Sequence, residues 1–210
     1  SRGGWVNSQL FDHTSTLKFL EKRFGVREDN ISDWRRAVCG DLTSAFDFAT
    51  PNQDWTALTL PATADYMQRV ARSKAAPTLK IPKTQSPSAQ DGPQRGARAL
   101  PYAISADARV KNGALWIDLV NAGRAGAVFQ VFDNTDRDGP WRFTLAAGEK
   151  YAGGHWNTAG RGPGPYDLTV HGPNGFYRRF AGDTSKAQPL VTVAADARSR
   201  LVVSLVGAGM

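Results

Sequence analysis

The residues best suited to chemistry stand near the start of the chain. Asp12 and His13 come just before an apolar helical pattern at residues 17–23. Because backbone N–H groups at a helix start favour anions, this pair could ligate a metal or orient a phosphate group. The structural alternative is that Asp12 caps the helix and His13 hydrogen-bonds a neighbouring carbonyl. The spacing alone favours the structural alternative.

The other candidate sites are weaker. His155 and His171 lie far from His13 along the chain, so the histidines form no cluster in the sequence. Residues 133–139 read Asp-Asn-Thr-Asp-Arg-Asp-Gly, which has the oxygen density of a calcium loop. The distal bidentate Glu of such loops is missing, which favours a solvated hairpin turn. Cys39 is the single cysteine and is expected to be a small buried side chain.

The net charge of +7 is concentrated in one stretch. Residues 69–98 hold seven basic residues and one acidic residue, together with four prolines and no aromatic residue. This is the composition of an extended, solvated linker. Such a linker could contact anionic lipid or nucleic acid, although solvation alone explains its composition. We expect no nucleic-acid partner.

The elements that must position these residues differ along the chain. Short helices are predicted at residues 17–23, 33–39 and 43–48, the first closed by Gly25. Three short helices with aromatic faces make a poor core alone, so we expect them to need a sheet that this chain does not supply. One further helical segment is expected at residues 62–72, inside a Pro-rich bridge.

From residue 101 the hydrophobic pattern alternates with period two. The Asn-Gly pairs at residues 112–113 and 174–175 predict two hairpins. Short strands at this spacing predict an antiparallel β-sandwich. The strands are expected at residues 102–110, 114–121, 127–132, 141–145, 150–156, 166–171 and 176–180.

A sequence repeat relates this region to the end of the chain. Residues 106–109 (Ala-Asp-Ala-Arg) recur as residues 195–198, and residues 115–123 align with residues 201–209. The second copy is three residues shorter at the turn and supplies only two strands, at 190–197 and 201–206. We therefore expect the tail of a larger protein, truncated within the second copy. A lone hairpin is marginal in water, so this one is expected to dock on the first copy, to be disordered or to drive association.

Residues 1–50 resemble a known family. The run Arg-Gly-Gly-Trp-Val-Asn-Ser-Gln-Leu-Phe-Asp-His-Thr-Ser at 2–15 and the run Trp-Arg-Arg-Ala-Val-Cys-Gly-Asp-Leu-Thr-Ser-Ala-Phe-Asp-Phe at 34–48 carry the resemblance. They look like bacterial phosphocholine-preferring phospholipases C, exported relatives of the acid phosphatases in the alkaline-phosphatase-like superfamily. That family has an α/β catalytic domain followed by two copies of a small β-domain, which fits the repeat.

The resemblance implies a parent enzyme that hydrolyses phosphatidylcholine-type phosphodiesters to diacylglycerol and phosphocholine, secreted or in the periplasm. It places the nucleophile and most metal ligands upstream, so a divalent metal is expected in the missing catalytic domain and none in this chain. Asp12 and His13 match a motif at the edge of that domain, where a supporting or structural role is expected and direct involvement is an open hypothesis. We expect the chain alone to be inactive, with no catalytic or cofactor-binding residue of its own, because phosphodiester hydrolysis needs a charge-neutralised, preorganised site.

The expected fold is mainly β, an antiparallel β-sandwich-like domain preceded by a short α-helical remnant of an α/β phosphoesterase domain and a Pro-rich linker. The expected divisions are residues 1–50, 51–100, 101–189 and 190–210. Phospholipid is the expected substrate of the missing catalytic domain, with membrane-surface contact by the basic linker. The alternative function is a non-catalytic β-sandwich binding module for a lipid surface, a chaperone or a partner subunit.

Overall fold

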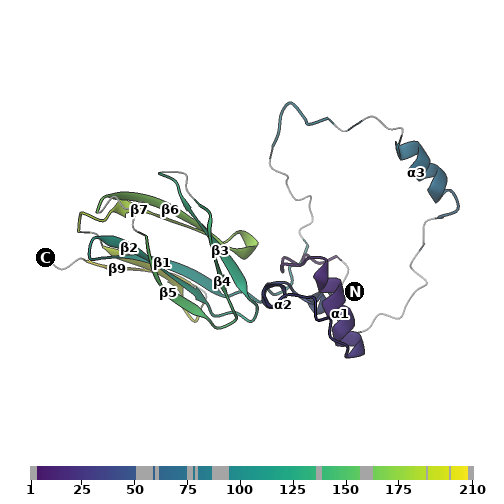
Figure 1. The fold of residues 1–210 in the computed structure, drawn as a ribbon, viewed down its shortest axis with the longest axis horizontal. Helices are drawn as coiled ribbons and strands as arrows, with labels where there is room; N and C mark the ends of the chain where they lie inside the picture. Colours follow the sequence, from purple (N-terminus) through teal and green to yellow (C-terminus); the bar gives the residue numbers. More distant parts are fainter. Residues whose placement is uncertain are drawn as a thin grey trace.

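The computed structural model describes residues 4–50, 59, 62–74, 78, 80–86, 95–135, 139–156, 163–187, 189–198 and 200–207. Figure 1 shows a helical part and a layered set of strands next to it, with one helix, α3, standing away from both. The early elements are α1 (Thr14–Phe24), α2 (Asp33–Val38), the 3-10 turn η1 (Thr43–Ala45) and α3 (Tyr66–Lys74). All of the predicted helical segments are present, although the third is only a single 3-10 turn. Within the described part of the chain, none of the helices has the length and apolar character that crossing a membrane requires.

The strands between residues 104 and 183 form two antiparallel sheets, as the alternating pattern predicts. One sheet has the order β1-β2-β5 and the other has the order β4-β3-β6-β7. The fold is therefore mainly antiparallel β, arranged as a sandwich (Figure 1). The strands are β1 (Ile104–Lys111), β2 (Ala114–Asn121), β3 (Ala127–Asp133), β4 (Trp141–Leu145), β5 (Lys150–Trp156), β6 (Pro165–His171) and β7 (Tyr177–Asp183).

The core lies between the two sheets. In β2, buried and half-buried side chains alternate, and Leu115, Ile117 and Leu119 are each at most 1% exposed. In β3, Phe129 and Val131 are fully buried in the same alternating way. Since residues i and i+2 of a strand share one face, this alternation places one face of each sheet in the core.

Left-handed turn residues close two of the hairpins. Asn112 and Gly113 have φ angles of 54° and 71° between β1 and β2, which is the pattern of a type I′ turn. Asn174 and Gly175 have φ angles of 56° and 73° between β6 and β7. Asparagine and glycine enter this region at the least steric cost. Both hairpins predicted from Asn-Gly pairs are confirmed.

Asn121 links the two sheets at one end of the sandwich. Its side chain is fully buried at the end of β2. Its Nδ2 donates to the carbonyl oxygens of Ala125 at 2.8 Å, of Leu145 in β4 at 3.1 Å and of Ala146 at 3.0 Å. Its Oδ1 accepts from the Gly123 N–H at 3.0 Å. Because buried polar groups need partners, this side chain fixes the loops that join the two layers.

The second copy of the repeat forms a separate two-stranded sheet, β8 (Leu190–Ala195) and β9 (Leu201–Val206). Some Cα atoms of β8 lie within 8 Å of β1, so the hairpin sits beside the first copy. The predicted extent of its first strand, 190–197, is wrong. Asp196 turns the chain instead, because its carboxylate accepts from the backbone N–H groups of Arg198 and Arg200. The repeated tetrapeptide is thus strand in the first copy and mostly turn in the second.

One face of the β8–β9 hairpin corresponds to the buried face of β2. The counterparts of the three β2 core residues are Leu201, Val203 and Leu205. They are 74%, 53% and 69% exposed. The same sequence pattern therefore has a covering layer in the first copy and lacks one over these three residues in the second.

Candidate functional site

Asp12 ties the start of α1 to α2. Its Oδ1 accepts from the Thr14 hydroxyl at 2.5 Å and from the Thr14 N–H at 2.8 Å, and its Oδ2 pairs with the Arg35 guanidinium. The pKa of Asp12 is lowered to about 2. The hydrogen bond from the Thr14 hydroxyl is the largest cause, and burial acts in the opposite direction. The Thr14 amide and Arg35 lower the pKa further. These contacts hold the carboxylate ionised and fix it between two helices. Proton transfer at neutral pH is not favoured by so low a pKa.

His13 occupies the N-cap position of α1, with φ −61° and ψ −26°. Its side chain is exposed and makes no capping hydrogen bond to the helix. The capping contact that the sequence suggested comes from Asp12, whose carboxylate accepts the Thr14 N–H. The expected role of Asp12 and His13 in supporting the catalytic residues upstream of this chain stays a prediction.

A second polar network connects α1 with the residues around α2. Glu21 receives two hydrogen bonds from Arg36, at 2.9 and 3.0 Å. The Arg36 hydrogen bonds are the main cause that lowers the pKa of Glu21 to about 2. Lys18 Nζ donates to the carbonyl oxygens of Arg36, at 3.0 Å, and of Cys39. Cys39 itself is buried as expected, and burial raises the pKa of its thiol, the charge of Asp12 adding to the effect. These contacts position helices and supply no reactive thiolate.

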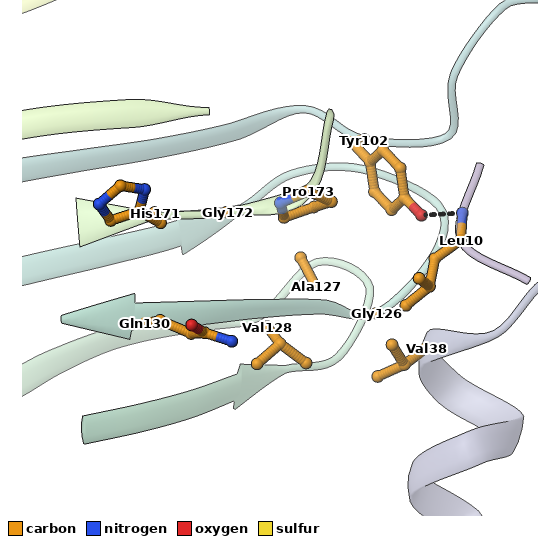
Figure 2. Close-up of a pocket in the computed structure, with 10 residues that line it drawn as sticks. All are labelled: Leu10, Val38, Tyr102, Gly126, Ala127, Val128, Gln130, His171, Gly172 and Pro173. Atoms are coloured by element: carbon orange, nitrogen blue, oxygen red, sulfur yellow. Dashed lines mark hydrogen bonds between the residues drawn. The ribbon is translucent and has the colours of Figure 1, made fainter. Parts of the chain in front are cut away.

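The helical part meets the sandwich at a cavity of about 260 Å³. Figure 2 shows Leu10 and Val38 on one side and strand and loop residues of the sandwich on the other. The Tyr102 hydroxyl accepts from the Leu10 N–H at 2.9 Å. The cavity is lined by Leu10, Val38, Tyr102, Gly126, Ala127, Val128, Gln130, His171, Gly172 and Pro173.

Two more hydrogen bonds fix this junction. The Gly126 N–H donates to the Ala37 carbonyl oxygen at 2.8 Å, and a Cβ at position 126 would lie 2.8 Å from that same oxygen. Trp34 Nε1 donates to the Thr144 hydroxyl at 2.9 Å. Sequence reasoning missed all of these partners, because the bonded residues are far apart in the chain and most bonds involve backbone. The glycine at 126 was the one available signal of a close backbone approach.

The polar side chains of the cavity are few. Gln130 lies on β3, and the His171 ring lies edge-on to Phe132 at 5.4 Å and to Tyr177 at 5.2 Å between ring centroids. A largely apolar cavity whose polar side-chain groups are one amide, one imidazole and the Tyr102 hydroxyl suits packing or ligand binding. It lacks a paired nucleophile and base among its lining residues. The cavity is therefore typical of a structural junction between the helical part and the sandwich.

Metal ligation was the less favoured possibility for Asp12, His13 and the loop at 133–139, and the described residues supply no ligand set for it. Among them, no group of three or more His, Cys, Asp and Glu side chains lies close enough to hold a metal ion. In the loop at 133–139, the Asp133 carboxylate accepts from the Thr135 N–H at 2.8 Å, and residues 136–138 lie outside the described residues. His155 lies in β5, and its side chain is likewise outside them. The described side chains do not fit the divalent-metal site of a phosphodiesterase.

Two families match the chain. Residues 96–183 match the family described as bacterial phospholipase C, C-terminal domain. Residues 1–27 match the phosphoesterase family. The first match covers the sandwich, and the second covers the segment that holds Asp12, His13 and α1.

Whole proteins with similar sequences are phospholipases C. The non-hemolytic phospholipase C of Pseudomonas aeruginosa is 49% identical over 191 residues, which are 87% of this chain and 26% of that protein. The enzyme of the same name from Burkholderia pseudomallei is 44% identical over 193 residues, 89% of this chain and 27% of that protein. The hemolytic phospholipase C of P. aeruginosa is 36% identical, over 92% of this chain and 30% of that protein. The chain thus spans 26–30% of the length of these curated relatives. It belongs to the bacterial phospholipase C family and corresponds to a C-terminal portion of those enzymes.

Proposed function

We propose that this chain is the C-terminal region of a phospholipase C that hydrolyses phosphatidylcholine-type phosphodiesters to diacylglycerol and phosphocholine. The observation that carries the proposal is the 49% identity to a non-hemolytic phospholipase C over 87% of this chain. We place the catalytic core, together with a divalent metal, in the remaining part of such an enzyme. The parent enzyme is proposed to be secreted or periplasmic.

We divide the chain at the expected boundaries, with residues 1–50 as the end of the phosphoesterase domain. The exposed face of α1 supports this, since Leu17, Leu20 and Phe24 are 41%, 43% and 66% exposed. An apolar stripe of this kind on an amphipathic helix normally faces a core. Residues 51–100 are the linker, 101–189 the first β-domain and 190–210 the start of a second.

Asp12 and His13 are proposed to support the catalytic domain from its edge. Asp12 is committed to Thr14 and Arg35 and would act by orienting α1 against α2. His13 is exposed beside it and would face the neighbouring part of the domain. The basic linker is proposed to contact the membrane surface that holds the phospholipid.

A chimera tests this assignment. The corresponding segment of the P. aeruginosa non-hemolytic enzyme, 49% identical, is replaced by this chain, and turnover of phosphatidylcholine and of a soluble chromogenic phosphocholine ester is measured. We expect the chimera to turn over both substrates, and the isolated chain to turn over neither. Turnover by the isolated chain, or a folded chimera that is inactive on both substrates, would contradict the proposal.

A further inference from the structure

Helix α3 has an apolar side that is open to solvent. Tyr66 and Met67 are 59% and 77% exposed, and Val70 is half-buried. At about 100° per residue, these three residues and Ala71 fall on one side of the helix. The helix begins where the Arg69 N–H donates to the Asp65 carbonyl oxygen at 2.9 Å.

The opposite side of α3 is basic. Arg69 and Arg72 are exposed on it, with Gln68 and Ser73 beside them. Beyond the helix, Lys80 and Lys83 are exposed as well. Asp65 is the single acidic residue between positions 62 and 86. The charge of this element is therefore strongly positive. Its two exposed arginines lie on this side, whereas Lys74 is the last residue of the helix and its position falls at the C-terminal end of the apolar side.

A helix of this length needs a partner to be stable. α3 has nine residues, and isolated helices of fewer than about 12 residues are marginal in water. Figure 1 places α3 apart from α1, α2 and the sandwich. The free energy that stabilises α3 must then come from burial of the Tyr66, Met67 and Val70 side chains in a membrane or against a binding partner.

The pattern fits a lipid surface. Interfacial helices combine a cationic polar face with apolar and aromatic side chains that enter the boundary between headgroups and acyl chains. Arginine side chains then reach anionic phosphates at the surface. Nucleic acid would use the arginines and leave the apolar side uncovered. The basic side and the apolar side of α3 together therefore favour an anionic lipid bilayer over nucleic acid as the binding partner.

We propose that α3 is an interfacial helix that lies in the plane of an anionic phospholipid surface. Tyr66, Met67 and Val70 enter the acyl boundary, and Arg69 and Arg72 contact lipid phosphates. This inference rests on the proposed function, because it names the element through which the basic linker makes its membrane contact.

An exchange of two neighbouring residues tests the proposal on the full chain. The double variant Met67→Gln with Gln68→Met keeps composition, charge and length, and it moves the apolar side chain to the basic side. Partitioning onto sedimented vesicles of phosphatidylcholine with phosphatidylglycerol is compared with the parent chain and with the single variant Gln68→Met. We expect the double variant to bind roughly tenfold more weakly, because it loses the burial of one large apolar side chain. The single variant should bind within about twofold of the parent, since it keeps Met67.

Either of two outcomes would overturn the proposal. Equal binding by the double variant and the parent would mean that the apolar side is unused. Equal binding to vesicles of phosphatidylcholine alone would mean that the arginines are unused. The circular dichroism of the sandwich serves as the folding control for each variant. Turnover of the soluble ester by the chimera does not require a membrane, so it reports the proposed function separately.

Discussion

Leu119 and Leu205 occupy equivalent positions in the two copies of the repeat, and truncating each to alanine should have very different effects. Leu119 is 1% exposed in the core, whereas Leu205 is 69% exposed on β9. Removing a fully buried leucine side chain loses its transfer free energy and leaves a cavity, which costs 2–5 kcal/mol. We expect Leu119→Ala to lower the free energy of unfolding by about 3 kcal/mol.

Leu205→Ala should cost far less. Only about a third of its surface is removed from water, so it loses about a third of the ~2–3 kcal/mol of a fully buried leucine. A value below about 1 kcal/mol is expected, with no cavity contribution. The two variants delete the same atoms, so each is the control for the other.

Equilibrium unfolding in urea measures both values. Tryptophan fluorescence reports the transition, and unchanged slopes against denaturant show that the unfolded state is the same. A Leu205→Ala loss as large as that of Leu119→Ala would refute the reasoning, because it would mean that the hairpin face is buried in solution. A Leu119→Ala loss below about 1 kcal/mol would instead refute the placement of β2 in the core.

Three further changes test the junction and the loops. Asn121→Ala leaves buried carbonyl oxygens without their donor and should destabilise the sandwich by about 2–3 kcal/mol in a thermal melt; a loss under about 0.5 kcal/mol would contradict the buried network. Gly126→Ala places a Cβ 2.8 Å from the Ala37 carbonyl oxygen and should raise hydrogen exchange in α2, whereas Gly164→Ala meets nothing within 4 Å and should not. The pKa of Asp12 falls from 3.8 to about 2 on folding, so its stabilisation is present above pH 4 and is lost between about pH 4 and pH 2. In the variant Asp12→Asn, the loss of unfolding free energy between pH 4 and pH 2 should be smaller by about 1 kcal/mol, after allowance for solvent screening. An acid-unfolding curve identical to that of the parent chain would contradict this stabilising role of Asp12.

The strands could be predicted because their signals are local. The β2 and β4 bounds predicted from alternation, 114–121 and 141–145, equal those observed. Alternating side chains must place one face in a core, and Asn-Gly pairs leave few choices of turn. Neither signal depends on residues elsewhere in the chain. This is why the sandwich follows from sequence while its contacts with the helices do not.

The junction could not be predicted for the opposite reason. The Trp34–Thr144 and Leu10–Tyr102 hydrogen bonds join residues whose separation along the chain is 110 and 92 positions. Indole, hydroxyl and amide groups are common donors and acceptors, so nothing in their sequence context selects the partner. Asp12 was singled out correctly as a polar group at a helix start, but its partner Arg35 was not. Pairing of this kind is set by packing of the elements after they form.

The distribution of exposed apolar side chains separates the chain into one self-sufficient part and two dependent parts. The sandwich has a core between its own sheets, in which Phe129 is 0% exposed. By contrast, Phe24 on α1 is 66% exposed and Leu201 on β9 is 74% exposed, at positions where the pattern calls for a core. A protein that exposes such faces together gains most from a body that covers them. The sandwich should therefore keep its fold in isolation, and α1 and the hairpin should gain protection from exchange when the chain is part of the chimeric enzyme. Equal protection in both settings would mean that these faces need no further layer.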